Sequence, residues 1–238
     1  MNVFENMRTN KPSGEYHVIT MNDPGSAIAE QYRKLRTNID YSSFNEEIKV
    51  MNLTSSFPGE GKTVTALNLA VVYSQAEQKT LVIDMDLRKP KIHRGFNLSN
   101  STGLTDIITK DKNKDDVIQK VSEYLHVLSA GEKMPFPAEF LMSKKLKALV
   151  ETLKGEYDRI IIDCPPMTAV TDASIISKFT DGTIIIVASR KTNGDVAQSI
   201  VKTLKENGAN IIGSVLTRVQ RKDQRYISGY YYYSDYSE

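Results

Sequence analysis

Apolar positions in this chain gather in short continuous runs. Five such runs lie at residues 50–53, 81–83, 160–162, 183–188 and 211–216. Strands that are covered by helices on both faces have this appearance, because neither face alternates with solvent. The pattern predicts five buried strands.

Segments of helical character separate these runs. Residues 64–75 follow the first run, residues 146–153 are amphipathic, and Val196, Ile200 and Leu204 recur at four-residue spacing. Alternating strands and helices are typical of a doubly wound α/β fold with a mostly parallel sheet. At 238 residues the chain has the length of one such domain.

The first residues follow a different pattern. Up to about Pro24 they are polar with scattered Gly and Pro, which predicts an extended arm, and Ser26 is a suitable N-cap for a helix. That helix has one apolar face and a neighbouring charged face. The apolar face comprises Ile28, Tyr32, Leu35 and Ile39, and the charged face Glu30, Arg33 and Arg36.

Tyrosine is concentrated at the other end. Residues 226–238 contain six of the twelve tyrosines, namely Tyr226, Tyr230, Tyr231, Tyr232, Tyr233 and Tyr236. Four consecutive tyrosines favour a strand, whereas the surrounding Gly, Ser and Asp favour a mobile end. We therefore divide the chain into an arm (1–25), a domain (26–220, with helix 26–44) and a flexible tail (221–238).

A phosphate-binding motif, SSFPGEGKT, occupies residues 55–63 between a predicted strand and a predicted helix, as a Walker A loop requires. Its glycines allow backbone N–H groups to face phosphate oxygens, its lysine reaches the β- and γ-phosphates, and its threonine can bind Mg²⁺. Ser56 stands where the motif has its first glycine. We expect Lys62, as an exposed loop lysine, to contribute little to stability. The predicted nucleotide contacts are Ser55, Pro58, Gly59, Glu60, Gly61, Lys62 and Thr63.

Carboxylates follow two other predicted strands. Asp84 and Asp86 end the run LVIDMD, and Asp163 ends IIID. The carboxyl ends of parallel strands meet at one edge, so all three should lie beside the phosphate loop. There they can hold Mg²⁺ and accept a proton during phosphoryl transfer, although each could instead cap its strand.

Composition limits the partners and the cellular compartment that we expect. Lys and Arg total 31 against 29 Asp and Glu, which gives no indication of nucleic-acid binding. The single cysteine, Cys164, cannot form an internal disulfide, and a reducing cytoplasm suits it. We expect no membrane span and no signal peptide, so any membrane association should require a partner.

Three segments together resemble the Walker A, A′ and B motifs of the bacterial tyrosine kinases of capsule and exopolysaccharide synthesis. They are SSFPGEGKT (55–63), LVIDMDLRKP (81–90) and IIIDCPP (160–166). EQYRKLR (30–36) is similar to that family's E-x-x-R-x-x-R oligomerisation helix, and the terminal tyrosines also match. The resemblance covers nearly the whole chain.

The resemblance implies a P-loop protein-tyrosine kinase that uses ATP and Mg²⁺ and phosphorylates its own tail tyrosines in trans. It implies that Lys62, Asp84, Asp86 and Arg88 serve catalysis, and that Thr63, Asp86 and Asp163 organise the metal. Glu30, Arg33 and Arg36 would form the contacts of a ring, which the resemblance implies is an octamer. A membrane activator subunit and a tyrosine phosphatase are further implied partners, at the inner face of the membrane.

Two other functions fit a P-loop protein of this kind. A partitioning or division-site ATPase carries a signature lysine five positions before the loop lysine, where this chain has Phe57, and a basic C-terminal helix is also lacking. A nucleotide-dependent assembly switch without kinase activity would use the tyrosines for docking. Thr217, near the last predicted strand, replaces an adenine-contacting Asn of related ATPases, so the basis of adenine recognition stays open.

Overall fold

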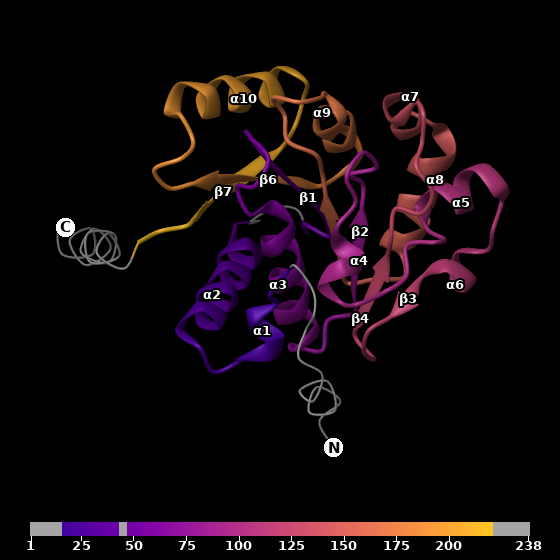
Figure 1. The fold of residues 1–238 in the computed structure, drawn as a ribbon, viewed down its shortest axis with the longest axis horizontal. Helices are drawn as coiled ribbons and strands as arrows, with labels where there is room; N and C mark the ends of the chain where they lie inside the picture. Colours follow the sequence, from indigo (N-terminus) through magenta and orange to yellow (C-terminus); the bar gives the residue numbers. More distant parts are fainter. Residues whose placement is uncertain (1–15, 43–46, 221–238) are drawn as a thin grey trace.

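The protein folds around one seven-stranded sheet with helices on both faces (Figure 1). The computed structural model describes residues 16–42 and 47–220. The strands are β1 Val50–Ser55, β2 Thr80–Asp84, β3 Gln119–Lys120, β4 Leu125–Leu128, β5 Arg159–Asp163, β6 Gly182–Ala188 and β7 Ile211–Thr217. The longer helices are α2 Ala27–Tyr41, α3 Lys62–Ser74, α5 Leu104–Lys110, α8 Lys144–Lys154 and α10 Gly194–Glu206. The short ones are α1 Ile19–Asn22, α4 Ile92–Gly95, α6 Lys114–Val117, α7 Pro137–Leu141, α9 Asp172–Ile176 and the 3₁₀ turn η1 Ser177–Phe179.

The strand order β3-β4-β2-β5-β1-β6-β7 confirms the doubly wound, mostly parallel fold. All pairs are parallel except β3 with β4. Each of the five predicted strands is present, and β3 and β4 were not predicted. A histidine interrupts the four-residue run of β4, and β3 has only two residues, so neither gave a hydrophobic signal.

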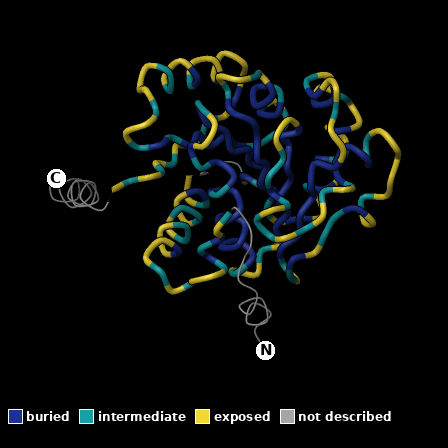
Figure 2. Tube along the Cα trace, viewed as in Figure 1, coloured by how far each residue is buried: buried dark blue, intermediate teal, exposed yellow. Residues whose placement is uncertain are grey.

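Side chains of the central strands alternate between two buried layers. In β5, Ile161 packs with helices α1 to α4, whereas Ile160 and Ile162 pack on the opposite face, under α5, α7, α8 and α9. Buried backbone accordingly fills the middle of the molecule, and exposed residues lie along the outer helices (Figure 2). This two-layer burial explains why the strands appear as continuous apolar runs.

Helix α2 begins where predicted, because the Ser26 hydroxyl accepts a hydrogen bond from the Ala29 N–H at 3.1 Å. Its predicted apolar face was wrong at one position. Ile28 is 59% exposed, while the neighbouring Ala29 is fully buried. The packed stripe runs through Ala29, Tyr32, Leu35 and Ile39. Ile28 lies about 100° away from Ala29 around the helix axis.

The extended conformation predicted before Pro24 was wrong over α1. Val18 and Thr20 are buried there, and the Thr20 hydroxyl and N–H both donate to the Asn68 side-chain oxygen in α3, at 2.9 and 3.0 Å. Gln75 at the end of α3 donates to the Thr20 carbonyl at 3.0 Å. Side chains of α3 thus supply partners that no local sequence pattern could indicate.

A polar network ties the end of α2 to the core. The Tyr73 hydroxyl of α3 and the Arg159 guanidinium of β5 both donate to one Asp40 oxygen, at 3.0 and 3.1 Å. Arg159 also lies over the Tyr73 ring, 5.3 Å from its centroid. Burial, reinforced by the Asp40 charge, raises the pKa of the fully buried Tyr73.

Within the described ranges, no helix has the length and hydrophobicity needed to span a bilayer.

The docking of α1 yields a stability prediction. Replacing Asn68 with Ala should lower the free energy of unfolding by about 1–3 kcal/mol, because the Thr20 N–H and hydroxyl would stay buried without their acceptor. Urea denaturation followed by circular dichroism measures this change. Lys34→Ala, on the exposed side of α2, is the control and should stay within about 0.5 kcal/mol of the unmodified protein. Equal stability of the two variants would contradict the role of Asn68.

Candidate functional site

The loop between β1 and α3 has the conformation of a phosphate cradle. Gly59 and Gly61 adopt left-handed backbone angles, with φ of 77° and 101°, and α3 begins immediately afterwards at Lys62. A Cβ on Gly61 would lie 3.3 Å from the Thr217 methyl group, so a side chain there would press on the end of β7. The N-terminus of the 13-residue helix α3 therefore opens onto a turn whose backbone N–H groups can bind an anion.

Lys62 is buried, contrary to the expectation of an exposed loop lysine. Only 7% of the residue is exposed, and its ammonium lies 3.1 Å from Asp86 Oδ2 and 3.3 Å from Asp163 Oδ1. Burial by itself would lower the pKa of Lys62, but the Asp163 and Asp86 charges outweigh it and raise that pKa overall. Lys62 is therefore a charged group on which the local charge balance depends.

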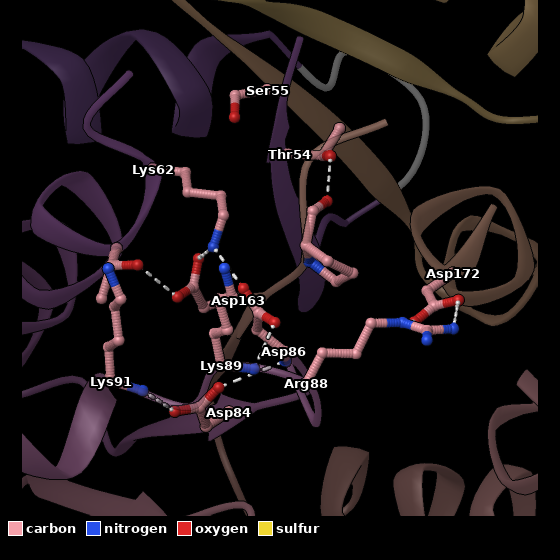
Figure 3. Close-up of polar contacts among 12 residues, drawn as sticks. Thr54, Ser55, Lys62, Asp84, Asp86, Arg88, Lys89, Lys91, Asp163 and Asp172 are labelled. Carbon is pink, nitrogen blue, oxygen red and sulfur yellow. Dashed lines mark hydrogen bonds and ion pairs between the residues drawn. The ribbon is translucent and has the colours of Figure 1, made fainter. Parts of the chain in front are cut away.

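Asp163 bridges the loop and the sheet. Its second oxygen, Oδ2, accepts a hydrogen bond from the Thr63 hydroxyl at 2.6 Å. Burial raises the pKa of Asp163, with Lys62 opposing the change. The structure thus brings Lys62, Thr63 and Asp163 together, as the sequence predicted. Figure 3 shows the Lys62 ammonium directed at Asp163.

Asp84 and Asp86 occupy different environments. Backbone N–H groups of Lys91 and Ile92 donate to Asp84 Oδ2 at 2.7 and 2.9 Å, and that of Asp86 donates to Oδ1 at 3.2 Å. Burial, together with the Asp163 charge, raises the pKa of Asp84 to about 7. Asp86 instead directs one oxygen at Lys62 and accepts from the Lys89 N–H with the other, at 3.0 Å. Asp84 orders the loop after β2, while Asp86 faces the lysine.

Arg88 points away from Lys62 and toward α9 (Figure 3). It makes two parallel hydrogen bonds to Asp172, at 3.0 and 3.2 Å, which raise the pKa of Arg88. Asp172 is only 1% exposed, and sequence reasoning missed it. The single available signal was an acidic residue in the first turn of a short helix.

Glu60, a predicted nucleotide contact, turns its side chain into the protein. One carboxylate oxygen accepts from the Phe57 N–H at 3.0 Å, and the other accepts from the Thr192 hydroxyl in the loop after β6. The Thr217 hydroxyl, on the last residue of β7, donates to the Glu60 carbonyl at 2.6 Å. Thr192 was not predicted, because its partner lies 132 residues away.

The charged face of α2 makes contacts within the subunit. Arg33 pairs with Glu30 at 2.7 Å and donates to the Pro24 carbonyl, and Arg36 donates to the Val72 carbonyl of α3 at 2.8 Å. The six tail tyrosines lie outside the described residues.

Comparisons with known proteins agree on one kind of protein. A family model described as an AAA domain matches residues 48–213. The tyrosine-protein kinase YwqD of Bacillus subtilis is 40% identical over 212 residues, 88% of this chain and 90% of YwqD. The putative tyrosine-protein kinase CapB of Staphylococcus aureus is 36% identical over 211 residues, 88% of this chain and 91% of CapB. The crystal structure of the chimerical protein CapA2B2 superimposes with a TM-score of 0.81 at 35% identity, over 91% of this chain and 98% of that one.

A more distantly similar solved structure shares the fold. The septum site-determining protein MinD of Pyrococcus horikoshii, solved with Mg-ADP, gives a TM-score of 0.62 at 24% identity, over 73% of this chain and 71% of MinD. That likeness shows a shared P-loop architecture and nothing more specific.

The burial of Lys62 changes what its removal should do. Lys62→Met should lower the free energy of unfolding at neutral pH by about 3 kcal/mol, because Asp86 and Asp163 lose their buried counter-charge. Denaturant unfolding without nucleotide tests this, with Lys147→Met on the exposed side of α8 as the control. If both methionine variants unfold at the same denaturant concentration, the buried ion pairs do not stabilise the fold.

Proposed function

We propose, because the chain belongs to the bacterial tyrosine-protein kinases, that it transfers phosphate from ATP to tyrosines of its own residues 226–236. Kinase activity toward tyrosine follows from the family. The identity of the acceptor, the trans arrangement and a role in regulating capsule or exopolysaccharide synthesis are our proposals.

The observation that carries the proposal is the position of Lys62. Lys62 is the first residue of α3 and directly follows the loop that contains the left-handed Gly59 and Gly61. In the described structure its ammonium pairs with the carboxylates of Asp86 and Asp163. The β- and γ-phosphates of ATP would offer it an alternative anionic partner, while the loop N–H groups bind the same phosphates.

The donor set also fits Mg²⁺. Asp84, Asp86 and Asp163 are all buried beside one lysine, which leaves an acidic excess that a divalent cation can balance. Thr63, Asp86 and Asp163 supply hard oxygen donors, and Mg²⁺ in such sites is held by few carboxylates together with phosphate oxygens. When bound, the ion would neutralise negative charge on the phosphates.

We propose different roles for Asp84, the last residue of β2, and Asp86, two residues later. Asp84 already accepts three backbone N–H groups, so we assign it the ordering of the loop that carries Asp86. Asp86 then serves as the acceptor for the tyrosine proton, besides its contact with the metal shell. For Arg88, whose side chain is 40% exposed and paired with Asp172, we propose contact with a neighbouring subunit.

Assembly completes the scheme. Glu30, Arg33 and Arg36 would form a head-to-tail contact that closes a ring, with an octamer as our proposed state. A tail from one subunit would enter the site of the next. A membrane activator subunit would recruit the ring to the inner face of the cell membrane, and a tyrosine phosphatase would reverse the modification.

The first prediction concerns the acceptor. After incubation with ATP and Mg²⁺, peptide mapping should find several phosphotyrosines within residues 226–236. For the trans step, Asp86→Asn protein with an intact tail is mixed with active protein whose six tail tyrosines are Phe. The tail of the Asp86→Asn protein should become phosphorylated in the mixture. When that protein is incubated by itself, its tail should be at least 100-fold less modified, because its own site neither positions the metal nor accepts the tyrosine proton.

Two outcomes would contradict this proposal. Unmodified tails in a preparation that hydrolyses ATP, with its activator present, would exclude the acceptor and favour a nucleotide-dependent assembly switch. Asp86→Asn protein that modifies itself at the normal rate would remove Asp86 from catalysis.

The second prediction concerns assembly. The double variant Arg33→Ala/Arg36→Ala should be more monomeric in light scattering, because it lacks the two positive charges of α2 that we propose contact the neighbouring subunit. Both arginines also make contacts within the subunit, so circular dichroism must show intact helix content. Lys34→Ala, from the same helix, should assemble normally. A double variant that keeps its fold and its assembly would exclude this interface.

Phosphorylation should then weaken the ring. Each phosphate adds about −1.5 to −2 charge, so three per tail add roughly −5 per subunit, and the tails repel one another.

A further inference from the structure

Two basic residues lie over the phosphate loop on the side away from the carboxylates that bind Lys62. Lys191 follows β6 and Arg218 follows β7, and both reach Gly59. We propose that they form a second nucleotide-contacting pair, in which Lys191 binds a phosphate that is not transferred and Arg218 provides a flat face for the base. This inference deepens the proposed function and rests on its nucleotide site.

The position of Lys191 carries the first half. Its ammonium is 3.6 Å from where a Cβ of Gly59 would be, so it lies directly against the loop. The two residues beside Lys191 help to orient it. Arg190 adopts a left-handed conformation with φ of 59°, and Thr192 is anchored to the Glu60 carboxylate. The exposed Lys191 side chain thus extends over the loop from a segment that the contact between Thr192 and Glu60 joins to it.

Arg218 carries the second half. Its Nη2 donates to the Gly59 carbonyl at 2.6 Å, and its own backbone is left-handed, with φ of 56°. Non-glycine residues in this conformation are strained and are concentrated at functional sites. The guanidinium of the exposed Arg218 is therefore held at the edge of the loop. In our proposal its planar face stacks on the aromatic base, a contact that arginine makes readily.

Sheet order explains why Lys191 and Arg218 both reach the phosphate loop. Strand β1 ends in the phosphate loop, β6 pairs with β1, and β7 pairs with β6 as far as Ala188 and Thr217. The partners of Lys62 come from β5 and the loop after β2, on the other side of β1. A nucleotide whose terminal phosphate faces Lys62 would thus extend toward Lys191 and Arg218.

The same geometry bears on base selection. The Thr217 hydroxyl donates to the Glu60 carbonyl, so it braces the loop. Stacking on a guanidinium does not distinguish adenine from guanine, because both present the same kind of π face. We therefore expect ADP and GDP to bind with affinities that differ by less than about tenfold.

Titration calorimetry with ADP and Mg²⁺ tests the pair without any phosphoryl transfer. Lys191→Gln should weaken ADP binding by about tenfold, as expected for the loss of one charge-assisted contact. The difference in ADP affinity between this variant and the unmodified protein should be smaller in 500 mM salt than in 50 mM salt, because salt screens the charge of Lys191. Arg218→Gln should weaken ADP and GDP to the same extent. Lys205→Gln, exposed on α10, is the matched control and should bind as the unmodified protein does.

The variants also guard against a folding artefact. Lys191→Arg keeps the charge and should restore most of the ADP affinity, and thermal unfolding should be the same for all lysine variants. Equal ADP affinity for Lys191→Gln and Lys205→Gln overturns the phosphate contact. A tenfold preference for ADP over GDP that Arg218→Gln abolishes would overturn stacking in favour of specific hydrogen bonding. Protein that binds ADP as expected and leaves its tyrosines unmodified would contradict only the proposed function.

Discussion

The site depends on a balance of buried charge at the carboxyl edge of the sheet. Register places Asp84 directly opposite Asp163, and Asp86 follows two residues later, so three carboxylates share a region with one ammonium group. Lys62 neutralises part of this charge, and backbone N–H groups at Asp84 stabilise another part. Because burial makes uncompensated charge costly, each of these groups constrains the positions and protonation of the others.

Residues at or after the ends of three strands hold the phosphate loop in shape. The Thr168 hydroxyl, after β5, donates to the Ser56 carbonyl at 2.5 Å. Thr192, after β6, holds the Glu60 side chain, and Thr217, at the end of β7, holds the Glu60 carbonyl. Two hydroxyl donors thus hold the backbone of the turn, and the third holds the buried Glu60 side chain beneath it. A loop fixed in this way loses little freedom when it binds an anion.

The sequence was informative where a signal is local. Continuous apolar runs identified five strands, and SSFPGEGKT and the aspartates after β2 and β5 located the site, because strand ends of a parallel sheet must meet. It was uninformative where a partner lies far along the chain. Asp172 holds Arg88 across 84 residues, Asn68 folds α1 onto α3 across 48, and the burial of Lys62 requires acids from two other strands. The hydrophobic pattern contains none of these pairings.

The network around Tyr73 has a consequence for an enzyme that modifies tyrosine. The Tyr73 ring is fully buried, and its hydroxyl already donates to Asp40. A phosphate there would place two negative charges beside Asp40 and could not be attached without opening the core. Tyr41, one residue from Asp40, is by contrast 76% exposed. Burial therefore protects Tyr73, on which the core depends, from tyrosine phosphorylation, whereas an exposed tyrosine such as Tyr41 has no such protection.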